Sequence, residues 1–202
     1  MREIVLYWKR TLKRLDVSSR SLIALVEPGS CFAGTLFEIV LAADRSYMLD
    51  GSFEGSIQEP ATLRLTPMNF GPYPMGNGLT RLGTRFLGEP SRINELKDEI
   101  GEALDAETAD ELGLVTFTPD DIDWEDEVRL VLEERAGFSP DGLIGMEANL
   151  RFAGPETMET KIFARLSAWQ NWIFQRPNAT GPEGALKLYG TGKQSRYDRK
   201  RA

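Results

Sequence analysis

The sequence has no histidine and a single cysteine, Cys31, among its 202 residues. Without histidine there can be no Ser-His or Cys-His nucleophile pair, and the chain lacks a plausible ligand set for zinc, haem or copper. One cysteine also excludes a disulfide within the chain. Carboxylates alone would have to hold any metal ion, so we expect no metal site.

Long apolar runs are also missing. No segment approaches the ~18 consecutive apolar residues of a membrane span. The first residues, MREIVLYWKRTLKRLDVSS, carry charges throughout and have no apolar core of signal-peptide length. We therefore expect a cytoplasmic protein without membrane contact.

Basic residues are scarce in the middle of the chain. Residues 89–147 contain nineteen acidic and four basic residues, and the net charge of the whole chain is −7. A nucleic-acid surface needs clustered Lys and Arg, so we expect no nucleic-acid partner. The stretch 187–202 has six basic residues and one acidic residue. It is either a solvated tail or a contact for anionic groups, such as the phosphates of a nucleotide-tailed substrate.

The pattern of apolar residues predicts an α/β protein in its first half. An amphipathic helix is expected at 1–17, and short buried strands are expected at 21–26 and 46–49. Further strands are predicted at 61–66 and 114–117, and a short helix at 105–115 has Asp105 at its N-cap and Gly113 at its end. Alternating strands and helices favour an α/β core over residues 1–118.

The second half reads as helical. Helices are predicted at 120–135, from Ser139 to Phe152, and again from Pro155 at N1. The last helix has a broad apolar stripe that must bury against a core or a partner, and core packing is the favoured interpretation: Met158, Ile162, Phe163, Leu166, Trp169, Trp172, Ile173 and Phe174. We expect a helical region at 119–186 and a basic tail at 187–202.

The segment Glu27–Gly51 is the most informative one. It leads from the strand through a small-residue turn at Gly34 into a helix predicted to reach about Ala43. Thr35 and Glu38 fit a capping box, with Thr35 at the N-cap and Glu38 at N3. Unpaired N–H groups at such a turn can also stabilise an oxygen that gains negative charge. Glu38 is therefore either a helix cap or a functional carboxylate.

Several motifs then occur in an order that resembles the crotonase (enoyl-CoA hydratase/isomerase) superfamily. Glu38 and Asp44 keep the family's six-residue spacing, and Pro74–Leu82 resembles its P-G-x-G-G-T-x-R-L loop. A third match, to A-x-x-A-x-x-x-G-L-V, is formed by Ala106, Ala109, Gly113, Leu114 and Val115. Loops held rigid by a scaffold are common binding places, and Gly71–Leu82 has that character.

The resemblance implies a ClpP/crotonase-like partial domain that acts on a coenzyme A thioester. It implies an oxyanion turn at Gly34 and Thr35, catalytic roles for Glu38 and Asn69, and no cofactor other than the coenzyme A of the substrate. Substrate contacts would come from the turn and the loop: Cys31, Gly71, Gly76, Asn77 and Gly78. Local sequence alone makes Cys31 an inert small residue.

A narrower resemblance, over nearly the whole chain, is to one carbon–carbon lyase of that superfamily. It implies that 2,3-epoxybenzoyl-CoA is opened with water to a dehydroadipyl-CoA semialdehyde and formate. The family's second catalytic Glu falls at Met68 and Asn69 here, and Thr35 replaces a glycine. A generic hydratase or isomerase is thus disfavoured.

The counterpart of the family's first half is missing before Met1, so the sequence predicts an incomplete enzyme. We expect it to need a missing N-terminal portion or a second copy for stability, because an incomplete sheet leaves its edges open. The alternative to an active fragment is a non-catalytic scaffold or dimerisation module of the same enzyme.

Overall fold

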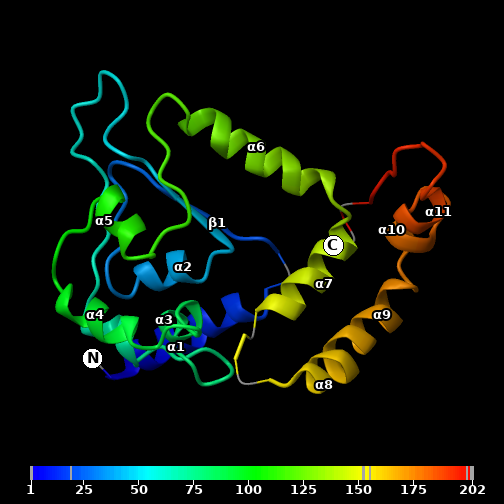
Figure 1. Ribbon diagram of the computed structural model, residues 1–202, viewed down its shortest axis with the longest axis horizontal. Coiled ribbons are helices and arrows are strands. Elements are labelled where there is room, and N and C mark those ends of the chain that lie inside the picture. Colours follow the sequence, from blue (N-terminus) through cyan, green and yellow to red (C-terminus); the bar gives the residue numbers. More distant parts are fainter. Residues whose placement is uncertain (1, 19, 152, 155, 199, 201–202) are drawn as a thin grey trace. The chain divides into compact units, whose positions relative to one another are not determined.

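The computed structural model describes residues 2–18, 20–151, 153–154, 156–198 and 200 (Figure 1). The chain divides into two compact units. The core unit comprises Met1–Asp16 and Leu22–Leu130, and the helical unit comprises Val17–Ser21 and Val131–Ala202. Within the described residues, no helix is both long and apolar enough to span a bilayer.

The core unit contains a two-stranded parallel sheet. Strand β1 (Ile23–Val26) pairs with β2 (Arg45–Met48), in a register that sets Ile23 opposite Arg45 and Val26 opposite Met48. Parallel neighbours need a crossover connection, and here it contains helix α2 (Phe37–Leu41). The predicted strands at 21–26 and 46–49 are confirmed, with ends shifted by one or two residues.

The strands predicted at 61–66 and 114–117 are wrong as regular strands. These segments form only isolated bridges, Leu63 with Leu104, Arg64 with Ala33 and Phe117 with Tyr47. Pro67 begins a 3₁₀ helix directly after residues 61–66. This proline prevents the segment from continuing as a strand. The side chains of Leu63, Leu65 and Leu114 are nevertheless buried, so apolar composition located the core but not the hydrogen-bond pattern.

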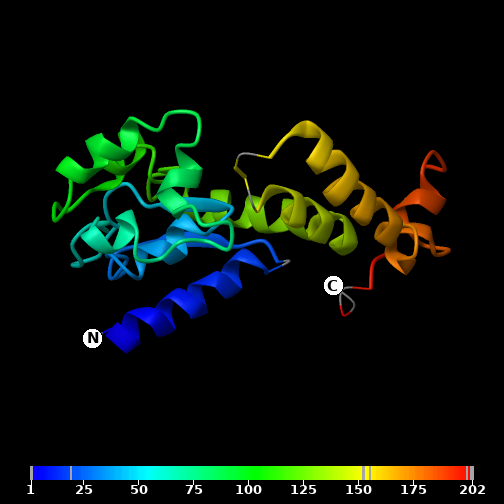
Figure 2. The same cartoon turned by 90° about the horizontal axis from the view of Figure 1, so that it is seen from below.

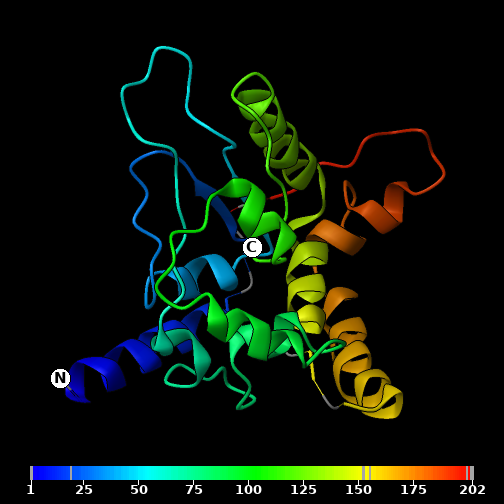
Figure 3. The same ribbon diagram turned by 60° about the vertical axis from the view of Figure 1, so that its left-hand side comes forward.

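The other helices of the core unit differ in length, and α1, with 15 residues, is the longest of them. Figure 2 shows α1 as one uninterrupted helix, and Figure 3 shows the loop 51–60, in cyan, projecting from the core unit. The Asp105 cap is confirmed, since its Oδ1 accepts from the Thr108 N–H at 2.9 Å. The helices of this part are α1 (Arg2–Asp16), η1 (Pro67–Phe70), α3 (Arg81–Arg85), α4 (Arg92–Asp98), α5 (Ala106–Glu111) and α6 (Trp124–Gly137), the last of which continues into the helical unit.

The helical unit is built on α7 (Pro140–Leu150), whose predicted start is confirmed, and the Ser139 hydroxyl caps it by accepting a hydrogen bond from the Gly142 N–H. Pro155, predicted at N1 of the next helix, and Phe152 lie outside the described residues. The remaining elements are α8 (Met158–Thr160), the π-helix η2 (Lys161–Leu166), α9 (Ser167–Ile173), α10 (Pro177–Thr180) and α11 (Ala185–Leu188).

The apolar stripe of α8, η2 and α9 is less buried than predicted. Trp169 packs tightly over Gly145 of α7, where a Cβ would overlap the indole ring. Phe163 and Met158 are 78% and 70% exposed, however, and none of the three elements contains a buried residue. The expected burial against the chain's own core is therefore wrong for most of the stripe.

The apolar core lies in the core unit and surrounds the sheet. Its members come from both strands, from α2 to α5 and from the two bridged segments, and they include Val26, Phe37, Met48, Leu63, Leu65, Leu82, Leu104 and Leu114. All eight are 2% exposed or less. The loop that contains Ile57 makes no part of this core, since that side chain is fully exposed.

Replacing Leu63 by alanine tests this core. Leu63 is fully buried, so Leu63→Ala should lower the free energy of unfolding by about 2–5 kcal/mol. Leu130→Ala is the matched control, since Leu130 belongs to the same unit and is 52% exposed. Urea unfolding followed by fluorescence measures both variants. Equal losses in the two would contradict the assigned core.

Candidate active site

The turn before α2 depends on Gly34. This residue has a φ of +49°, and its N–H donates to the Arg64 carbonyl at 3.0 Å. A Cβ at this position would lie 2.6 Å from Thr66 Oγ1. Both the left-handed backbone and the close approach of Thr66 therefore require glycine.

The predicted capping box at Thr35 and Glu38 is wrong. Helix α2 begins at Phe37 with Leu36 at the N-cap, and no side chain caps it. The Thr35 hydroxyl instead forms a 3.0 Å hydrogen bond with the Tyr73 hydroxyl. Within the described residues, no acceptor takes the Thr35 N–H. The Gly34 N–H is already bonded to Arg64, so the predicted oxyanion role at this turn stays a prediction for the Thr35 N–H.

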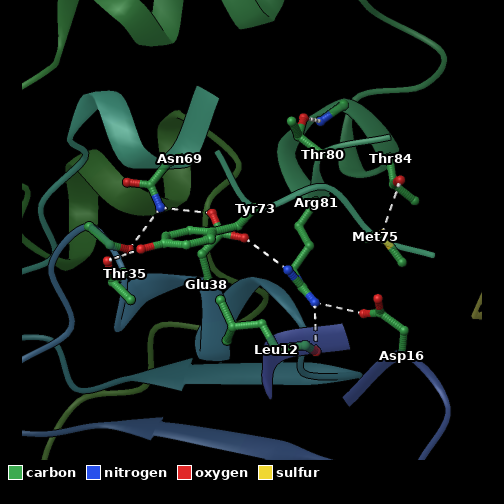
Figure 4. Close-up of polar contacts among 12 residues, drawn as sticks. Leu12, Asp16, Thr35, Glu38, Asn69, Tyr73, Met75, Thr80, Arg81 and Thr84 are labelled. Atoms are coloured by element: carbon green, nitrogen blue, oxygen red, sulfur yellow. Dashed lines mark hydrogen bonds and ion pairs between the residues drawn. The ribbon is translucent and has the colours of Figure 1, made fainter. Parts of the chain in front are cut away.

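Glu38 is a buried carboxylate with a partner on each oxygen. Its side chain is 1% exposed. Oε1 accepts from Asn69 Nδ2 at 2.9 Å, and Oε2 accepts from Arg81 Nη1 at 3.0 Å. Figure 4 shows the Arg81 guanidinium reaching from Glu38 toward Asp16. The position of Glu38 thus results from tertiary contacts and not from helix capping.

Arg81 bridges two carboxylates that lie far apart in the sequence. Its Nη2 donates to Asp16 Oδ1 at 2.7 Å and to the Leu12 carbonyl at 3.1 Å. The side chains of Arg81 and Asp16 are only 2% and 3% exposed. The two carboxylates and one guanidinium form a buried ionic chain, Glu38–Arg81–Asp16, which ties α2 and α3 to the last turn of α1.

Burial raises the pKa of Glu38 above its ordinary value of 4.5. The hydrogen bond from Asn69 and the charge of Arg81 oppose this rise, and the charge of Asp16 adds to it. A carboxylate with a raised pKa is a stronger base, which suits it to accept a proton. Raised values of this kind also occur in structural ion-pair networks.

The side-chain amide of Asn69 is fully hydrogen-bonded. Nδ2 donates to the Gly34 carbonyl at 2.8 Å as well as to Glu38, and Oδ1 accepts from the Thr66 N–H at 3.0 Å. Thr66 and Asn69 form the capping box of η1, with Asn69 at N3. Asn69 thus connects the Gly34 turn to Glu38, and its catalytic role stays a prediction.

The predicted substrate-binding residues are spread over the turn and the loop. Cys31 is exposed, and so are Gly71, Gly76, Asn77 and Gly78. Of these five, Gly76 bonds to the ionic chain, because its N–H donates to Asp16 Oδ2 at 3.2 Å. Asn77 Oδ1 accepts from the Leu79 N–H, and Gly78 has a φ of +87°. Substrate contact by these five residues remains a prediction.

The residues that the sequence-based reasoning missed are Asp16, Tyr73 and Arg81. Arg81 lies in the T-x-R-L part of the loop motif, so the sequence did mark this residue. Asp16 and Tyr73 had no local signal, since their partners lie 65 and 38 residues away. Among the described residues, no group of three Cys, Asp or Glu side chains could hold a metal ion.

Comparison with solved structures identifies the fold. The chain matches an enoyl-CoA hydratase from Geobacillus kaustophilus with a TM-score of 0.71 and 20% identity, covering 98% of this chain and 68% of the other. An enoyl-CoA hydratase from Bacillus anthracis matches with a TM-score of 0.68 and 18% identity, and the match covers 97% of this chain and 69% of the other. The chain has the crotonase fold. The fold predicted from the ordered motifs is therefore confirmed.

Sequence comparison gives a more specific relationship. Over 198 residues, which are 98% of this chain, it is 58% identical to benzoyl-CoA-dihydrodiol lyase of Aromatoleum evansii. The chain is a homologue of that lyase. It spans 35%, or about a third, of the lyase's own length. No family model matches the sequence.

Gly34→Ala tests the shape of the turn. The new Cβ would clash with Thr66, so this variant should be about 1–3 kcal/mol less stable to urea than Gly55→Ala. Gly55 is the matched control because its φ is also positive, at +75°, and nothing lies within 4 Å of a Cβ built there. Equal losses would show that the approach of Thr66 does not constrain the turn.

Proposed function

We propose that this chain is the crotonase-fold part of a carbon–carbon lyase that acts on a coenzyme A thioester. The observation that carries the proposal is the 58% identity to benzoyl-CoA-dihydrodiol lyase over 98% of the chain. The crotonase fold is compatible with it, since the enoyl-CoA hydratases of this fold are named for coenzyme A thioesters.

The proposed reaction opens the ring of 2,3-epoxybenzoyl-CoA. Two water molecules add, one ring carbon leaves as formate, and the other six acyl carbons form a dehydroadipyl-CoA semialdehyde, so atoms and electrons balance without an oxidant. The reaction requires no redox cofactor or metal, and the substrate supplies the coenzyme A. Proton transfer and charge stabilisation are then the tasks of the protein.

Two groups support this chemistry. The ionised Glu38 carboxylate can take a proton from water, and its raised pKa suits that role. The Thr35 N–H can donate to the thioester oxygen as negative charge develops, an interaction whose loss typically costs about 100- to 1,000-fold in rate. Asn69 orients Glu38, because its amide bonds the carboxylate and the Gly34 carbonyl together.

A second candidate function is a non-catalytic scaffold or dimerisation module of the same lyase. It is favoured by the state of Glu38, whose two oxygens are both bonded and whose side chain is 1% exposed. In that case water would not reach the carboxylate, and the reaction would occur elsewhere in the protein. A generic enoyl-CoA hydratase is disfavoured because Met68 and Asn69 occupy the place of the second carboxylate.

The cellular setting is part of the proposal. We place the protein in the cytoplasm with a small-molecule thioester as its ligand and no nucleic-acid or membrane partner. A second copy, or a further part of the same polypeptide, would cover the exposed side chains of Met158, Phe163 and Phe174.

Glu38→Gln in the protein that contains this chain separates the two candidates. Glutamine keeps the shape and a bond to Arg81 but cannot accept a proton as a base. We expect the turnover number for ring opening, measured as formate released, to fall about 100- to 10,000-fold. Glu54→Gln, in the exposed loop, is the matched control. Near-normal turnover of Glu38→Gln would contradict the catalytic role and favour the scaffold function instead.

A further inference from the structure

We propose that Arg81 and Asp16 are positioning residues that hold Glu38 for its role in the reaction and connect it to helix α1 and the Gly71–Leu82 loop. This inference rests on the proposed function of Glu38. Neither residue is placed in contact with substrate. Both act through the carboxylate.

The Arg81 guanidinium links Glu38 to helix α1. Arg81 uses one amino group for Glu38, at 3.0 Å, and the other for Asp16, at 2.7 Å, and for the Leu12 carbonyl. The guanidinium is planar and rigid, so fixing one end of it fixes the other. The last turn of α1 therefore constrains, together with Asn69, where the Glu38 carboxylate lies.

Asp16 links the Gly71–Leu82 loop to Arg81. Asp16 Oδ1 accepts from Arg81, and Oδ2 accepts from the Gly76 N–H. Gly76 belongs to the loop whose glycines are predicted to contact substrate. Three successive contacts, Gly76 to Asp16, Asp16 to Arg81 and Arg81 to Glu38, thus join that loop to the carboxylate. A shift of the loop on substrate binding would be transmitted along them.

The charges of Arg81 and Asp16 act on Glu38 in opposite directions. Arg81 and Asp16 are the charged groups that act on Glu38, and the neighbouring Asn69 is neutral. Arg81 lowers the pKa of Glu38 and Asp16 raises it. Activity that needs ionised Glu38 rises as the pH passes this pKa. Removing Arg81 should therefore move the acidic limb of the profile to higher pH, and neutralising Asp16 should move it to lower pH.

The test compares Arg81→Met, Arg81→Lys and Asp16→Asn in the full protein by their kcat against pH. We expect Arg81→Met to move the acidic limb upward by about 1–3 pH units. Asp16→Asn should move it downward by less, because Asp16 contacts Glu38 only through Arg81. Arg81→Lys keeps the positive charge and should return the limb toward its original position. Lower activity with an unmoved limb in all three variants would overturn the proposal.

A second readout keeps this test separate from that of the proposed function. The carboxyl ¹³C signal of Glu38, identified by its loss in Glu38→Gln, reports the pKa without turnover. Opposite shifts of this pKa in Asp16→Asn and Arg81→Met support the coupling even if Glu38→Gln remains active, in which case only the catalytic role fails. If Arg81→Met does not fold, Asp16→Asn alone tests the coupling. An unchanged Glu38 pKa in Asp16→Asn would then contradict the coupling.

Discussion

The buried guanidinium of Arg81 is the group on which the candidate site depends. It forms ion pairs with one carboxylate from α1 and one from α2, in surroundings where all three side chains are 3% exposed or less. Ionised groups leave water at a cost of several kcal/mol each, which is offset only when every partner is in place. Removing one member of the chain of contacts is consequently costly, because it leaves a buried charge without its partner. The contacts also tie α1, α2 and α3 to one another.

That dependence explains what the sequence could and could not predict. Local signals located β1, β2 and the cap at Asp105, because a short apolar run or a helix cap is encoded within a few consecutive residues. The same local reasoning misassigned Glu38, whose T-x-x-E pattern fits a capping box. Its actual partner Arg81 lies 43 residues away and Asn69 lies 31 away, and no local pattern encodes such distances.

The ordered motifs of the crotonase superfamily supplied the long-range information that local patterns lacked. They predicted the fold, which structural matches at 18–20% identity confirm. They also brought Glu38 and Asn69 together as site residues before their contact was known. They did not predict Asp16, because it lies on α1, outside the motifs. Nor did they predict how much of the α8–α9 stripe stays exposed, since the stripe also lies outside these motifs.

The most direct test of this account is the unfolding free energy of Arg81→Met against that of Arg129→Met. Arg129 also pairs with an aspartate, Asp126, but at the surface, where its side chain is 54% exposed. A buried chain of ions predicts a loss of about 3–5 kcal/mol for Arg81→Met, against about 0–1 kcal/mol for the exposed pair. Similar small losses in both variants would contradict the claim that Arg81 holds the site together.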